Sequence, residues 1–236
     1  MCCGEYGNPA MRTKILCCRT LEPEVRLAME KCGCNRELQV LHDSNHDVPN
    51  RLRSCIQEIL DDMKDVDRVL LAFTTCGGAM VGLRAGDFEL VIPRVDDCLS
   101  LLMGSMERRQ KVLEGGFGLF VTRSWLENEH NTIAQLEYIR NKYPAPRANK
   151  IIETMYGHFN SLNVIDTGAY DVPSILPQTQ QIARQLNLKH RVIQGTLSYL
   201  EELLQGPYDP SQFIIIQPRT AVREYDTLLK PCIYTK

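Results

Sequence analysis

Three cysteines each come at the end of a short apolar run that is typical of a buried β-strand. They are Cys18, Cys76 and Cys98, and the runs before them cover residues 14–16, 69–73 and 90–93. The ends of such strands face one crevice in an open α/β sheet. Three thiols gathered there would form a soft, incomplete ligand set, suited to an iron–sulfur cluster with one free iron or to zinc with one open position. Either centre would leave a coordination position for a substrate.

The first of these thiols belongs to a pair, Cys17-Cys18. Adjacent side chains on a strand point to opposite faces, so we expect one of the two to reach the crevice. We favour Cys18, because it leads into Thr20-Leu21-Glu22-Pro23-Glu24, which has the hydroxyl and the early acids of a helix start. The structural alternative is that both thiols are buried strand residues, since free cysteine packs well in cores.

Cys76 is followed by Gly77 and Gly78. Glycines beside a ligand let the backbone approach a cofactor closely and aim N–H groups at sulfur, so we count both as cofactor-binding candidates. The alternative is a strand-to-loop turn that needs positive φ and has no chemistry.

Cys98 stands at the predicted start of a helix that ends near Gly104, and Asp96 or Asp97 is a natural N-cap for it. The positive end of the helix would lower the pKa of the Cys98 thiol, whereas the two carboxylates would raise it, so the direction stays open. Asp97 is the third cofactor-binding candidate.

Apolar bursts of four to six residues alternate along the chain with helical patterns. We expect strands near 13–18, 37–41, 68–73, 89–93, 117–122, 161–165, 191–193 and 212–217, and helices near 50–63, 128–143, 147–157, 173–187 and 196–205. This rhythm predicts βαβ units and an α/β fold, an open, mostly parallel sheet with helices on both faces that leaves room for two similar α/β lobes.

The domain boundary is placed at the Pro144/Pro146 break. It gives a flexible tail over 1–12, which carries Cys2 and Cys3, an N-terminal lobe over 13–145 and a C-terminal lobe over 146–236. In the helix near 50–63 an apolar stripe includes Cys55, which we therefore expect in the core.

Composition narrows the class of protein. The 236 residues are 44% hydrophobic and 24% charged with a formal charge of −2, which excludes disordered and fibrous classes. No signal peptide and no long apolar run stands out, so we expect a cytoplasmic chain whose ten cysteines are free or metal-bound. Basic residues are scattered singly, which argues against nucleic-acid and membrane partners. Paired C-x₂-C units, which a preformed zinc finger needs, are missing from the sequence.

A wider set of residues resembles the domain-of-unknown-function family numbered 1638. The set comprises Cys18 leading into Thr20-Leu21-Glu22, His46-x-x-Pro49-x-x-Leu52-Arg53, Cys76-Gly77, Pro93-Arg94-x-Asp96-Asp97-Cys98-Leu99-x-Leu101-x-x-Gly104-Ser105, Trp125, Asp166-Thr167-Gly168 and Gly195. The similarity spans roughly residues 13–217. One departure is Phe73-Thr74-Thr75-Cys76-Gly77, where the family usually has Tyr-Gly-x-Cys-Gly.

The resemblance implies an α/β protein typical of anaerobic bacteria and archaea, often found near corrinoid-dependent methyl-transfer systems. Its pattern selects Cys18, Cys76 and Cys98 among the ten cysteines, the same three that the strand ends select. Loss of the tyrosine leaves the thiol in place and alters the surroundings in which a small molecule would bind.

Three further residues are candidates for catalysis. His46 could be a fourth ligand or a general acid, while His42 is better explained as a turn residue. Arg94 could clamp a carboxylate or phosphate, or pair with a neighbouring aspartate. Asp166 ends a predicted strand and could reach the same crevice from the second lobe, or make an Asx-turn. Trp125 could line a pocket or pack in the core.

The leading hypothesis is a protein with an open-site [4Fe–4S] cluster that acts on a small molecule, with lyase or desulfidase chemistry. One alternative is a zinc–thiolate site that supports methyl transfer, with a corrinoid protein or a methyltransferase as partner. Another is a non-catalytic protein that binds a small molecule or handles metal. Nucleotide-dependent and Ser-His-Asp classes lack their motifs.

Overall fold

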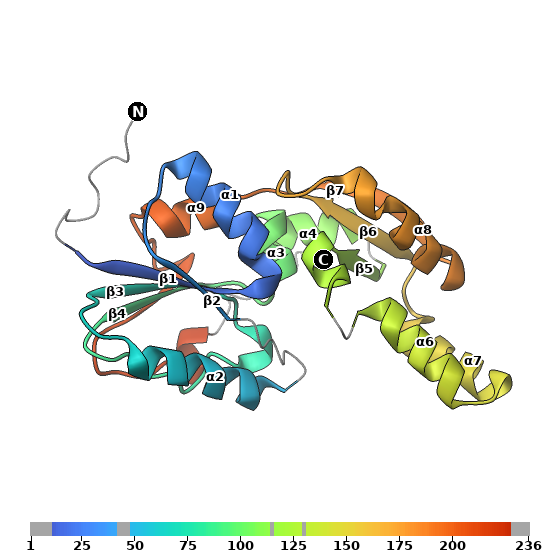
Figure 1. The fold of residues 1–236 in the computed structure, drawn as a ribbon, viewed down its shortest axis with the longest axis horizontal. Coiled ribbons are helices and arrows are strands. Elements are labelled where there is room, and N and C mark those ends of the chain that lie inside the picture. Colours follow the sequence, from blue (N-terminus) through green and yellow to red (C-terminus); the bar gives the residue numbers. More distant parts are fainter. Residues whose placement is uncertain (1–10, 42–47, 114–115, 129–130, 228–236) are drawn as a thin grey trace, which may run out of the picture. The chain divides into compact units, whose positions relative to one another are not determined.

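A computed structural model describes residues 11–41, 48–113, 116–128 and 131–227 of the chain (Figure 1). The chain forms two compact units, and each is described by itself. The first unit combines residues 1–108 with 196–236, and the second unit comprises residues 109–195. This division differs from the predicted boundary at 145/146, because the last part of the chain returns to the first unit.

The first unit is built on a five-stranded sheet in the order β2-β1-β3-β4-β8. Its strands are β1 (Thr13–Cys18), β2 (Leu38–Leu41), β3 (Arg68–Ala72), β4 (Glu89–Pro93) and β8 (Phe213–Ile216). The pairings among β1 to β4 are parallel, and β8 pairs antiparallel with β4. The sheet is therefore mostly parallel, as the alternating pattern predicts.

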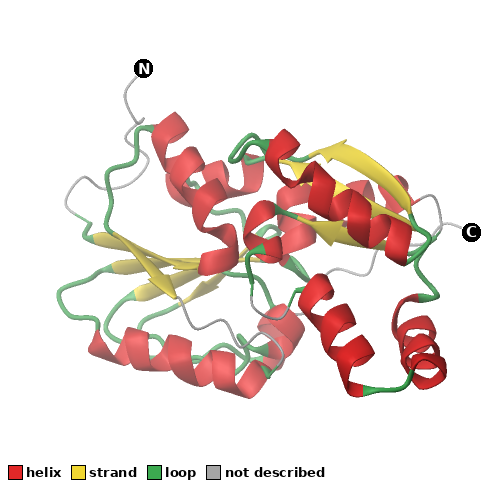
Figure 2. Ribbon diagram, turned by 45° about the vertical axis from the view of Figure 1, so that its right-hand side comes forward, coloured by secondary structure: helices red, strands yellow, loops and turns green. Residues whose placement is uncertain are grey.

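The strand order reverses between β1 and β3, because β2 lies on one side of β1 and β3 on the other. The helices that follow the first two strands, α1 (Glu22–Cys32) and α2 (Pro49–Asp62), cover opposite faces of the sheet (Figures 1 and 2). Such a reversal opens a crevice outside the carboxyl ends of the two strands, where α/β proteins bind their ligands.

Helix α2 covers one face of this sheet with an apolar stripe. Its Leu52, Ile56 and Leu60 are buried in a core that also contains Leu16 and Cys18 of β1. Burial of each large aliphatic side chain contributes about 1.5–3 kcal/mol. Cys55 is partly buried and packs against the same core, which confirms its predicted place.

Helix α9 (Ser198–Gln205) belongs to the first unit although it follows the second in sequence. It packs against α1 and contacts β3 and β4. The short helix α3 (Cys98–Met103) begins after β4 and ends at Gly104, whose φ of 84° closes it in the left-handed region. The end predicted at this glycine is confirmed.

The second unit contains three parallel strands in the order β5-β6-β7. The strands are β5 (Gly118–Val121), β6 (Ser161–Asp166) and β7 (Lys189–Gln194), and the helices are α5 (Arg123–Leu126), α6 (Thr132–Lys142), α7 (Ala145–Tyr156) and α8 (Leu176–Gln185). Helix α4 (Met106–Leu113) leads into this unit. Trp125 packs against its buried core, which is one of the two roles predicted for it.

Candidate thiol centre

Three cysteines stand at the carboxyl ends of three adjacent parallel strands in the first unit. Cys18 is the last residue of β1. Cys76 begins η2 (Cys76–Gly78), a single 3-10 turn after β3, and Cys98 is the first residue of α3 after β4. Since β1, β3 and β4 are neighbours in the sheet, the fold brings the three predicted thiols to one edge, at the reversal of strand order.

The pKa values of all three thiols are raised. Burial, with a smaller contribution from Cys76, raises the pKa of Cys18 to about 11. Burial likewise raises the pKa of Cys76. The pKa of Cys98 lies well above its usual value because of burial first, then Cys76, Asp97 and Cys18. We call Cys18, Cys76 and Cys98 the thiol cluster.

The raised pKa of Cys98 answers the question that its position at a helix start leaves open. Burial and the surrounding negative groups outweigh the positive end of the short helix. All three thiols are therefore protonated near neutral pH, and a metal that binds them has to displace their protons.

Cys17 differs from Cys18 in its surroundings. Burial raises the pKa of Cys17 to about 12, and the charges that act on it are those of Cys18, Glu22 and Arg26. Cys18 belongs to the buried core against which Cys76 packs. Of the adjacent pair it is thus Cys18 that shares a face with another member of the thiol cluster.

Two threonine hydroxyls are hydrogen-bonded to sulfur atoms of the thiol cluster. Thr20 Oγ1 is 2.6 Å from Cys18 Sγ, and Thr74 Oγ1 is 3.1 Å from Cys76 Sγ. Both hydrogen bonds favour the charged form of the thiol and oppose part of the effect of burial.

The turn that carries Cys76 is left-handed over three successive residues. The φ angles are 42° at Cys76, 63° at Gly77 and 88° at Gly78. The two glycines adopt this region freely, whereas Cys76 is strained there. Both glycines thus form the positive-φ turn that was the alternative to a cofactor-binding role. Strained non-glycine residues such as Cys76 are concentrated at functional sites in proteins.

Helix α2 contacts this turn through hydrogen bonds from Arg53. Arg53 donates hydrogen bonds to the carbonyls of Ala79 (3.3 Å) and Gly78 (3.4 Å). A methyl group on Gly77 would lie 3.6 Å from Pro49 Cγ, an ordinary contact distance. The start of α2 therefore stands directly against the Cys76 turn.

The loop before Cys98 is fixed at both of its ends. Asp97 caps α3 by accepting a hydrogen bond of 2.9 Å from the backbone N–H of Ser100, so the cap is Asp97. Thr75 contacts the same loop twice, through its hydroxyl to the carbonyl of Asp96 and through its backbone N–H to the carbonyl of Val95 (3.2 Å).

The thiol cluster is not arranged as a closed ligand set. Within the described ranges, no group of three or more His, Cys, Asp or Glu side chains lies in positions that could hold a metal ion. The strand order nevertheless brings the three thiols to one edge of the sheet, and the pKa of Cys98 is raised by both Cys76 and Cys18. Three soft donors at one edge of the sheet suit iron–sulfur or zinc chemistry.

The predicted catalytic residues are distributed differently. His46 and His42 lie outside the described residues. Arg94 donates hydrogen bonds to the carbonyls of Pro210 (3.1 Å) and Asp226 (2.6 Å), which ties the end of β4 to the segments on either side of β8. Asp166 belongs to the second unit and accepts a hydrogen bond of 3.0 Å from the N–H of Gly168, an Asx-turn.

Three supporting residues were not assigned roles from the sequence: Arg53, Thr74 and Thr75. The hydroxyl of Thr20 was predicted to mark a helix start, but no side chain caps α1 and this hydroxyl bonds Cys18 Sγ instead. The family pattern contained two signals that could have drawn attention to the other three residues. Thr74 and Thr75 stand where the resemblance departs from the family pattern, and Arg53 stands inside one of its motifs.

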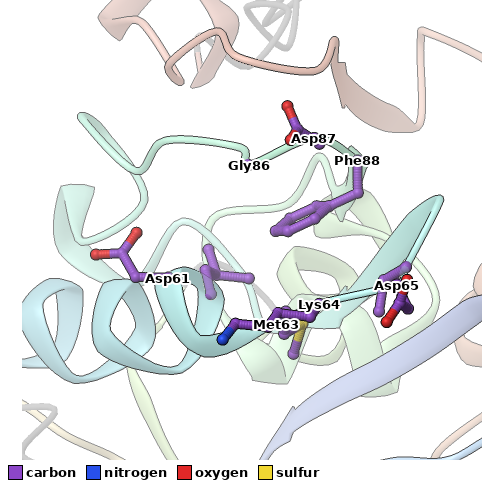
Figure 3. Close-up of a pocket in the computed structure, with 9 residues that line it drawn as sticks. Asp61, Met63, Lys64, Asp65, Gly86, Asp87 and Phe88 are labelled. Atoms are coloured by element: carbon purple, nitrogen blue, oxygen red, sulfur yellow. The ribbon is translucent and has the colours of Figure 1, made fainter.

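A hollow in the first unit lies at residues other than those of the thiol cluster. It has a volume of about 400 Å³ and lies where α2 ends and β3 and β4 begin. Its lining is formed by Leu60, Asp61, Met63, Lys64, Asp65, Val66, Gly86, Asp87 and Phe88 (Figure 3). Two of its carboxylates are already in ion pairs, Asp65 with Arg12 and Asp87 with Arg219. The thiol cluster, at the carboxyl ends of the strands, is the better candidate site.

The fold and the strand-end cysteines define the class of protein. It is an α/β protein with a thiol cluster at the point where the strand order of its mostly parallel sheet reverses. The chain belongs to the family described as protein of unknown function DUF1638, whose model matches residues 40–204. The match includes Cys76 and Cys98, while Cys18 precedes it. No curated protein and no solved structure matches the chain. In the described part of the chain, no helix is both long and apolar enough to cross a membrane.

Proposed function

We propose that Cys18, Cys76 and Cys98 hold a [4Fe–4S] cluster with one iron open to a small-molecule substrate. The observation that carries this proposal is the placement of the three thiols at the carboxyl ends of the adjacent strands β1, β3 and β4. Ligands of α/β sheets bind at this edge.

The chain itself would perform several steps when such a centre is bound. The three thiols lose their protons and ligate as thiolates. Burial of Cys18 limits access of water and oxidants to its sulfur. The cluster would supply a Lewis-acidic iron for lyase or desulfidase chemistry.

Three thiolates without the paired spacings of zinc-binding motifs favour a cluster over zinc. A zinc–thiolate centre that supports methyl transfer, with a corrinoid protein or methyltransferase as partner, is the alternative. A protein that binds a small molecule without metal is the third reading.

The test is to purify the chain without oxygen and to measure iron, acid-labile sulfide and zinc per chain. We expect about four iron atoms and about four sulfides. Cys18→Ser, Cys76→Ser and Cys98→Ser should each lose most of the metal. Cys55→Ser is the matched control, because Cys55 is also partly buried against the core and should keep the metal.

The outcomes separate the alternatives. If the protein contains zinc without sulfide, and the same three variants lose that zinc, the centre is a zinc–thiolate site and not an iron–sulfur cluster. Equal metal content in all four variants would show that Cys18, Cys76 and Cys98 are not the metal ligands. Circular dichroism of each variant distinguishes loss of metal from loss of fold.

A further inference from the structure

The sulfur atoms of the thiol cluster differ in their hydrogen-bond donors. Cys18 Sγ has the hydroxyl of Thr20 at 2.6 Å, and Cys76 Sγ has the hydroxyl of Thr74 at 3.1 Å. Backbone N–H groups of Thr20 and Leu21 also favour the charged form of Cys18. Cys98 has a hydrogen bond of this kind from its own backbone, and within the described ranges no side-chain hydroxyl bonds its sulfur.

The direction of the two hydroxyl bonds is fixed once a metal is bound. In the thiol form either partner can donate. A ligating thiolate has no proton, so the sulfur can only accept and the threonine must donate. Thr74 is completely buried, so water does not compete for its hydroxyl.

We propose that Thr20 and Thr74 are positioning residues that donate hydrogen bonds to the ligating sulfurs of Cys18 and Cys76, and thereby leave Cys98 as the most electron-rich ligand of the centre. This inference rests on the proposed function. Hydrogen bonds to ligating sulfur withdraw electron density and help to set the reduction potential of an iron–sulfur cluster. The two threonines therefore make reduction of the cluster easier and make the Cys98 sulfur its most nucleophilic ligand.

The experiment compares Thr20→Val and Thr74→Val, which remove each hydroxyl and nearly keep the shape of the side chain. The reduction potential of the loaded protein is measured by titration followed by electron paramagnetic resonance. Each variant should keep its iron content and shift the potential to a more negative value, and the double variant should shift it further. Thr20→Ser and Thr74→Ser retain a hydroxyl and should restore the potential.

Thr220→Val is the matched control. Thr220 belongs to the same unit, and its hydroxyl bonds the carbonyl of Gln217 and no sulfur (2.7 Å). The potential of this variant should equal that of the original protein.

The results distinguish the two proposals. A cluster that loads normally and keeps its potential in both valine variants would overturn the role of the threonines and leave the proposed function standing. If the centre is zinc, the readout becomes the rate at which iodoacetamide alkylates the zinc thiolates, which should rise about fivefold per hydroxyl removed, the equivalent of about 1 kcal/mol. A chain that binds neither metal overturns both.

Discussion

The hydroxyl of Thr75 donates a hydrogen bond of 2.8 Å to the backbone carbonyl of Asp96. This contact joins the loop that carries Cys76 to the loop that carries Cys98, across two neighbouring strands. The relative position of two of the three thiols thus depends on a side chain that is not itself a ligand candidate.

Thr75→Val should lower the free energy of unfolding of the metal-free protein by about 1 kcal/mol, because it removes this partly buried hydrogen bond. Urea unfolding measures the change. Thr75→Ser keeps the hydroxyl and should recover most of the loss. Equal stability of the valine and serine variants would contradict the role assigned to the bond.

Arg53→Met should destabilise the protein by about 1–2 kcal/mol, because the carbonyls of Gly78 and Ala79 lose their charged donor. Hydrogen exchange of residues 76–80 should accelerate in this variant. The matched control is Arg184→Met on the exposed surface of α8, where a change within about 0.5 kcal/mol is expected. Similar effects of the two substitutions would show that Arg53 does not support the turn.

The strain at Cys76 predicts an unusual order of stability. In the metal-free protein, Cys76→Gly should be more stable than Cys76→Ala by up to about 1 kcal/mol, because alanine keeps a Cβ at a φ of 42°. Both variants should lose the metal. Thermal unfolding of the two proteins measures the difference, and the reverse order would mean that the left-handed turn is not kept in solution.

The buried thiols make the metal-free protein sensitive to alkali. Burial raises the pKa of Cys17 to about 12 and of Cys18 to about 11 from a usual 9.0. As the pH rises, the unfolded chain loses these protons first, so between pH 9 and 11 it binds fewer protons than the folded protein. The stabilisation is complete below pH 9 and falls as the pH rises through this window.

Urea unfolding at several pH values between 8 and 11 tests this dependence. Cys17→Ala removes one of the two groups and should flatten the decline. Buried tyrosines titrate in both proteins and therefore cancel in the comparison. An unchanged slope in the variant would contradict the raised pKa of Cys17.

Local patterns predicted the elements of this fold well. The apolar stripe of α2, including Cys55 at its edge, follows from helical periodicity alone, and each strand expected in the sequence is present within a few residues. Helix α4 was missed because it has no apolar stripe, and none of its residues is buried. The ends of parallel strands sufficed to bring Cys18, Cys76 and Cys98 together.

Pairing between distant segments could not be predicted in the same way. The strand expected near 212–217 was assigned to a C-terminal lobe, but Ile214 pairs with Ile92 in the first unit. The apolar pattern of a strand is the same whether it pairs with a strand of the first unit or with one of a C-terminal lobe. The pattern alone therefore does not identify the partner strand. The contacts of the Thr20 and Thr74 hydroxyls with sulfur were not predicted for a related reason, since they depend on the directions of individual side chains.

The return of β8 to the first sheet has a consequence for biosynthesis. When residue 195 has emerged from the ribosome, every residue of the second unit is available, while the first unit still lacks α9 and β8. The hydrogen bonds from Arg94 to Pro210 and Asp226 also have to wait until those two residues have been synthesised. Because long-range pairings form late and slowly, nascent chains hold Cys18, Cys76 and Cys98 on an unfinished sheet. The proposed metal centre would therefore be completed only after α9 and β8 have been synthesised.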